Sequence, residues 1–71
     1  MPDRSIVGAL GRVVRPVRGG RLPGEIQVVL AGEPTLLLAY CDEPLAEGVR
    51  VQVVNTRGSR QVDVEAWPRS R

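Results

Sequence analysis

Valine alternates with polar or charged residues in two segments of the last third of the chain. It occupies every second position of residues 49–53 and again of 62–64, and the polar stretch 55–59 (Asn-Thr-Arg-Gly-Ser) lies between them. Side chains of a strand point to opposite faces in turn, so this spacing gives each segment one apolar and one polar face. The pattern predicts a β-hairpin with a polar turn and indicates an all-β chain.

The small size of the chain, its single cysteine and its lack of histidine argue against an enzyme. A chain of 71 residues makes one small domain, and such a domain buries only about 60% of its unfolded surface. Cys41 is the single cysteine and there is no histidine, which disfavours a disulfide, a Cys–His nucleophile and a zinc site. We therefore predict no enzymatic activity, no cofactor and no metal, with Cys41 as a small buried hydrophobe.

Five strand-like segments follow one another, each bounded by glycine or proline. The first three span about Val7–Val17, Glu25–Ala31 and Thr35–Cys41, and the two valine segments complete the set. Short strands with frequent turns are typical of a small closed or partly closed barrel, or of a sandwich. We expect the domain to cover residues 6–67, with terminal tails at 1–5 and 68–71.

The middle of the chain carries two more local predictions. Residues 35–41 are apolar on both faces, so we expect this strand to be central and covered on both sides. Tyr40 shares a face with Leu36 and Leu38, which favours a core position for its ring. Residues 44–47 could form one helical turn that ends at Gly48.

Charge is divided among three parts of the chain. Residues 1–24 carry a net charge of +4, residues 25–48 carry −5 and residues 49–71 carry +3, which sum to +2. The oppositely charged parts could neutralise each other across neighbouring strands, or they could give the domain two faces of opposite sign.

Four arginines recur at every third position near the start of the chain. They are Arg12, Arg15, Arg18 and Arg21, and Gly19 and Gly20 separate the last two. A spacing of three alternates between the faces of a strand, so the four side chains cannot all line one flat surface. They are candidates for an anion site that binds nucleic acid, phospholipid headgroups or an acidic protein patch, or else they form a solvated, solubilising set.

Trp67 and two valines are further candidates for contact with a partner. Trp67 is in phase with Asp63 and Glu65, opposite the valines of its segment, so it either contacts a partner or packs over the barrel end. Val29 and Val54 fall on otherwise polar faces. They could form an apolar patch for self-association, so a homo-oligomer is possible.

Several short motifs along the chain match one family pattern in order and spacing. Residues 7–11 (Val-Gly-Ala-Leu-Gly) resemble its small-residue opening, and residues 23–26 (Pro-Gly-Glu-Ile) resemble its turn into the second strand. Residues 48–54 and the stretch from Gly58 to Val64 resemble its two closing strands. Together they resemble the C-terminal OB-fold domain of NfeD-like proteins, the soluble part of bacterial partners of flotillin- and stomatin-type membrane scaffolds.

This resemblance implies a five-stranded OB-like β-barrel that works as a non-enzymatic protein-interaction module, with a flotillin- or stomatin-like scaffold as the partner. Typical members carry transmembrane helices ahead of this domain, whereas the longest apolar run here is six residues. We therefore expect a cytoplasmic domain, without direct membrane insertion, that reaches a membrane through its partner. The alternative is a single-stranded nucleic-acid-binding OB domain that uses the arginine-rich loop.

Overall fold

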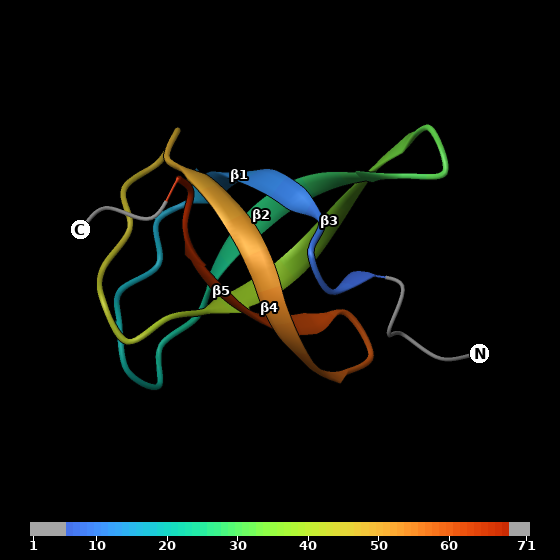
Figure 1. Ribbon diagram of the computed structural model, residues 1–71. Helices are drawn as coiled ribbons and strands as arrows, with labels where there is room; N and C mark the ends of the chain where they lie inside the picture. Colours follow the sequence, from blue (N-terminus) through green and yellow to red (C-terminus); the bar gives the residue numbers. More distant parts are fainter. Residues whose placement is uncertain (1–5, 69–71) are drawn as a thin grey trace.

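The computed structural model describes residues 6–68, which form a closed five-stranded barrel (Figure 1). The neighbouring order around the barrel is β1-β2-β3-β5-β4, and β4 returns to β1. The strands are β1 (Leu10–Arg15), β2 (Gly24–Leu30), β3 (Glu33–Tyr40), β4 (Arg50–Gly58) and β5 (Gln61–Ala66). The prediction of an all-β, five-stranded OB-like barrel is confirmed. The predicted tail at residues 1–5, and all of the tail at 68–71 except Pro68, lie outside the described residues.

The β2–β3 hairpin projects beyond the barrel wall. Its seven residue pairs run from Gly24–Ala39 to Leu30–Glu33, and positive φ angles at Ala31 and Gly32 form the two-residue turn. β1 pairs with β2 only as far as Val28, and β5 pairs with β3 only at residues 38–40. The tip of the hairpin therefore lacks strand neighbours and extends away from the barrel, as Figure 1 shows.

Alternating residues of all five strands fill the barrel interior. Each inward valine or isoleucine contributes about 1.5–3 kcal/mol by leaving water, so the interior supplies most of the stabilisation. The largest side chains with less than 2% exposure are Val13, Val17, Ile26, Val28, Val51, Val53 and Val62. Gly11 allows β1 to lie close against β2, because a Cβ at this position would stand 2.6 Å from the carbonyl oxygen of Gln27.

The closing hairpin is confirmed, but its turn is shorter than the sequence indicates. β4 continues through Asn55–Gly58, which the composition predicts as turn, and only Ser59 and Arg60 connect it to β5. Two register shifts, between Val53 and Asn55 and between Thr56 and Gly58, lie in this part of the hairpin. Such bulges accommodate extra residues within a ladder, so the polar residues 55–58 of β4 can continue the pairing with β5.

The first strand and the connection before the closing hairpin also differ from prediction. β1 spans Leu10–Arg15, and Gly8 lies in the preceding turn with φ of 95°. The helical turn predicted at residues 44–47 is wrong. Instead, the amides of Leu45 and Val17 each donate to the other's carbonyl at 2.9 Å. This pairing buries the Leu45 side chain, whereas one isolated helical turn is intrinsically unstable.

The prediction that the third strand is covered on both sides is wrong. Leu37 and Ala39 point into the barrel, but Leu36 is 49% exposed and Leu38 is 39% exposed. A single closed sheet has only one interior, so alternate residues of every strand face outward whatever their polarity. Tyr40 lies on the same outer face and is half-buried, which corrects its predicted core position.

Between Ile6 and Pro68 the structure has no helix with the length and hydropathy required to cross a membrane.

Candidate interaction surface

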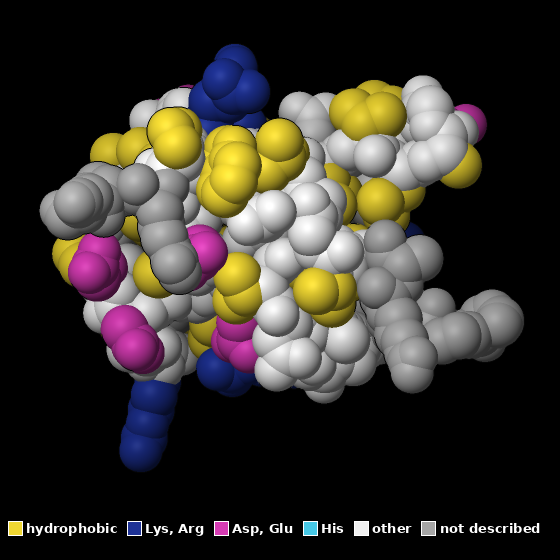
Figure 2. Space-filling model, viewed as in Figure 1, with side chains coloured by type: hydrophobic (Ala, Val, Ile, Leu, Met, Phe, Trp, Pro, Cys, Tyr) yellow, Lys and Arg dark blue, Asp and Glu magenta, His cyan; other side chains and the backbone are white. Residues whose placement is uncertain are grey.

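The projecting hairpin and β1 share an apolar outer surface. Val29 is 64% exposed and lies opposite Pro34 in the β2–β3 ladder, while Leu10 of β1 occupies the adjoining position. Leu36 is the next outward residue of β3 and lies opposite Gln27. Figure 2 shows hydrophobic side chains gathered on the projecting end of this hairpin. Exposed apolar residues that adjoin one another in this way mark surfaces that bind a partner.

A shallow groove of about 330 Å³ crosses this outer surface from β4 to β3. One side is aliphatic and the other carries two guanidinium groups. Its lining residues are Leu10, Gly11, Arg12, Gln27, Val29, Pro34 and Arg50. We call this feature the outer groove.

The two arginines of the outer groove face each other across β1 and β4. Arg12 is the register partner of Arg50. The amide of Val13 donates to the carbonyl of Val49 at 2.9 Å, so the adjacent Arg12–Arg50 pair is of the non-hydrogen-bonded kind, in which side chains lie closest. Neither arginine forms an ion pair with a carboxylate of residues 6–68. This part of the groove is therefore strongly positive.

The four predicted arginines do not form one site. Arg12 lies in the outer groove, whereas Nε of Arg15 is 3.3 Å from a carboxylate oxygen of Glu25 on the neighbouring strand. Arg18 and Arg21 are exposed in the loop before β2. Gly19 of this loop packs close to the backbone of Asp42, so the basic loop borders the acidic connection before β4. Arg50 completes the groove, and sequence reasoning missed it because its partner is 38 positions away.

Trp67 extends the row formed by the two groove arginines. Its amide donates to the carbonyl of Arg50 at 2.8 Å, and its side chain is 37% exposed. It follows β5 in phase with the outward-facing Asp63 and Glu65. Trp67, directly after β5, therefore lies beside Arg50 of β4, which lies beside Arg12 of β1. Two of the predicted candidates, Arg12 and Trp67, thus lie in one row, with Arg50 between them.

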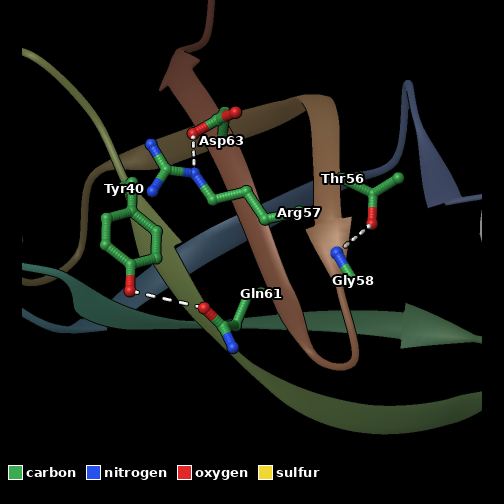
Figure 3. A network of polar contacts seen from close by, with 6 residues as sticks. All are labelled: Tyr40, Thr56, Arg57, Gly58, Gln61 and Asp63. Atoms are coloured by element: carbon green, nitrogen blue, oxygen red, sulfur yellow. Dashed lines mark hydrogen bonds and ion pairs between the residues drawn. The ribbon is translucent and has the colours of Figure 1, made fainter.

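A second polar cluster connects β3, β4 and β5 (Figure 3). The guanidinium carbon of Arg57 lies 3.9 Å from the centre of the Tyr40 ring, and its Nε is 2.8 Å from Asp63. The Tyr40 hydroxyl donates to Gln61 at 3.4 Å. β3 and β5 pair over only three positions, as β1 and β4 do, so these contacts reinforce one of the two shortest ladders of the barrel. They also occupy one face of the Tyr40 ring.

A depression of about 500 Å³ lies where β3 leaves β5. It is bordered by Cys41, Asp42 and Glu43 on one side and by Val64–Ala66 on the other. Cys41 is half-buried and packs against the core. Within residues 6–68, no group of three or more cysteine, aspartate or glutamate side chains is placed to hold a metal ion.

Two solved structures show a similar fold. The C-terminal domain of the stomatin operon partner protein 1510-C from Pyrococcus horikoshii superimposes with a TM-score of 0.77 at 22% identity, covering 97% of this chain and 98% of that one. The soluble domain of the NfeD protein YuaF from Bacillus subtilis gives a TM-score of 0.76 at 20% identity, covering 93% and 79%. No curated protein matches the chain. The sequence model of the NfeD C-terminal domain matches residues 10–65, and the chain belongs to this family.

Proposed function

We propose that this NfeD C-terminal domain is a non-enzymatic protein-interaction module that works with a stomatin- or flotillin-like scaffold. Family membership supports the assignment, and a structural relative bears the name stomatin operon partner protein. The observation that carries it is the exposed apolar face formed by Leu10, Val29 and Leu36 on a barrel with a well-filled interior. This surface has no use in the fold and is available to a partner.

Docking on this face would combine two physical effects. Burial of the aliphatic side chains from water supplies attraction without direction. The Arg12–Arg50 pair supplies direction, because a partner that presents carboxylates there is favoured over one that presents cations. In this proposal the domain is cytoplasmic and reaches the membrane through the scaffold that it binds.

Single-stranded nucleic acid has less support as the ligand. Recognition of single strands by OB folds depends on aromatic side chains that stack on the bases. Arg57 covers one face of the Tyr40 ring, and Trp67 is the other aromatic residue of the sequence, so a row of stacking side chains is missing among residues 6–68. The outer groove itself has no aromatic side chain in its lining.

Co-purification tests the proposed function. The 71-residue chain is co-expressed with a stomatin-like protein and, separately, with a flotillin-like protein of the native cell, and each mixture is analysed by size-exclusion chromatography. We expect co-elution with at least one scaffold, and loss of co-elution for the Val29→Glu/Leu36→Glu double variant. Leu22→Glu is the matched control, because Leu22 is equally exposed but lies in the loop before β2. Absence of co-elution with both scaffolds would refute the proposal.

A further inference from the structure

We propose that the outer groove binds an extended peptide segment of a partner, with carboxylates at Arg12 and Arg50 and aliphatic side chains on Leu10, Val29 and Pro34. The inference rests on the proposed function and names the chemistry of the segment that the domain recognises. The peptide belongs to a partner protein and alternates acidic with apolar residues.

The charge of the groove is the first argument for an acidic ligand. Like charges placed directly opposite each other on a strand pair destabilise the pair, and Arg12 and Arg50 are placed in this way. Arg15 and Arg57, in contrast, each lie within 4 Å of a carboxylate, that of Glu25 and that of Asp63. An acidic ligand would remove the repulsion between the groove arginines and gain charge-assisted hydrogen bonds.

The spacing of the groove is the second argument, and it favours an extended segment. The apolar row of Leu10, Val29 and Pro34 and the row that contains Arg50 and Arg12 are two residues apart along the strands. Two residues correspond to about 6.7 Å. An extended peptide lying between the rows directs alternate side chains to opposite sides. One set of side chains therefore meets the arginines and the other meets the aliphatic row.

Two observations separate this ligand from a lipid surface and from nucleic acid. Glu33 is exposed next to Pro34 of the groove lining, and its carboxylate would be repelled by an anionic bilayer. The aliphatic side of the groove carries leucine, valine and proline in place of the aromatic side chains on which bases stack.

Chemical-shift mapping of the 71-residue chain tests the proposal directly. The probe is a nine-residue peptide with glutamate at odd and leucine at even positions, added to the ¹⁵N-labelled protein at low ionic strength. We expect saturable shifts at the amides of residues 10–12, 27–29 and 50, and little change in the loop 18–22. A peptide with lysine in place of each glutamate is the charge-reversed control.

Two double variants with the same change in net charge isolate the role of the groove. Arg12→Gln/Arg50→Gln removes the facing cations, whereas Arg18→Gln/Arg21→Gln removes two exposed cations of the loop. We expect the groove variant to bind the glutamate peptide at least about tenfold more weakly and the loop variant to bind nearly as well as the parent. Unchanged spectra of the unbound variants outside the substituted sites would show that both fold.

Four results would overturn the proposal: no saturable shift, equal weakening by both double variants, equal binding of the lysine peptide, or tighter binding of a twelve-nucleotide thymidine strand at the same amides. Failure here is distinct from failure of the proposed function. A scaffold that still co-elutes with the parent chain, while the peptide does not bind, would retain the module and remove only this groove as its recognition site.

Discussion

The inner and outer faces of β2 carry similar residues but have opposite environments. Val28 is 1% exposed and Val29, the next residue, is 64% exposed. The first fills the barrel and the second lines the outer groove. The comparison teaches that hydrophobicity alone does not separate residues that build this fold from residues available to a partner; their phase within the strand does.

The largest difference between the two faces is expected in stability. Ile26→Ala would remove a fully buried side chain of the inner face and should lower the free energy of unfolding by about 2–5 kcal/mol. A domain of this size has about 4–10 kcal/mol in total. Val29→Ala on the outer face should change it by less than about 0.5 kcal/mol. Urea unfolding followed by circular dichroism measures both, and similar losses for the two variants would contradict the comparison.

A smaller loss of stability is expected at Gly11, where the close approach of β1 to β2 leaves no room for a side chain. Gly11→Ala places a methyl group 2.6 Å from the Gln27 carbonyl oxygen and 2.7 Å from a methyl of Val28. β1 must then move away from β2, and overpacking of this kind costs about 1–3 kcal/mol. The neighbouring outward change Leu10→Ala serves as the control and should be close to neutral. A Gly11→Ala variant as stable as the parent would show that the two strands are not held so closely.

On the outer face, the Arg57 cluster should contribute modestly to stability. Arg57→Ala removes the contact with the Tyr40 ring and the ion pair with Asp63, with an expected loss of about 0.5–1.5 kcal/mol. Arg18→Ala removes an exposed arginine of the loop and should have almost no effect. Thermal unfolding at low and at high salt separates the contribution of the Tyr40 contact from that of the Asp63 ion pair, because only the ion pair is strongly screened. Equal effects of the two variants would mean that the cluster does not stabilise the β3–β5 ladder.

The smallest predicted effect has the opposite sign. Arg50→Gln relieves the repulsion with Arg12 and should raise the free energy of unfolding by a few tenths of a kcal/mol. The gain should disappear near 1 M salt, where the Debye length is about 3 Å. Arg18→Gln, with the same change in net charge, should show no comparable gain in a urea titration. Destabilisation by Arg50→Gln at low salt would show that the groove arginines do not repel each other in the free domain.

Local alternation made the strands and the inner residues of the closing hairpin predictable. Val51, Val53, Val62 and Val64 are all buried, as their spacing indicates. The same rule could not assign faces in residues 36–38, because three consecutive leucines carry no alternation. The position of Leu45 was equally unpredictable from local patterns, because Leu45 pairs with Val17, which lies 28 residues away in the sequence.

The outer groove could not be predicted from local patterns either. Arg12 and Arg50 meet only because β4 closes the barrel against β1 in one particular register. A single sequence contains no period that relates two such distant strands. The exposure of the predicted arginines is expected for this residue type. Which of them lie together in a site depends on the tertiary structure.

The three-position ladder between β3 and β5 has a consequence for how the barrel forms and opens. β1, β2 and β3 are consecutive antiparallel neighbours, as are β4 and β5, so each group can assemble by closing short loops. Joining residues 38–40 to 61–63, like joining β1 to β4, brings together distant parts of the chain and contributes to slow folding. Both ladders have three register pairs, but four further backbone hydrogen bonds flank the β1–β4 ladder and only one, from the Leu38 amide to the Arg60 carbonyl, flanks the parallel ladder. The parallel junction therefore has fewer hydrogen bonds to lose. It is the natural site for subglobal opening, and its amides, beginning with Leu38, should exchange with solvent before those of β4.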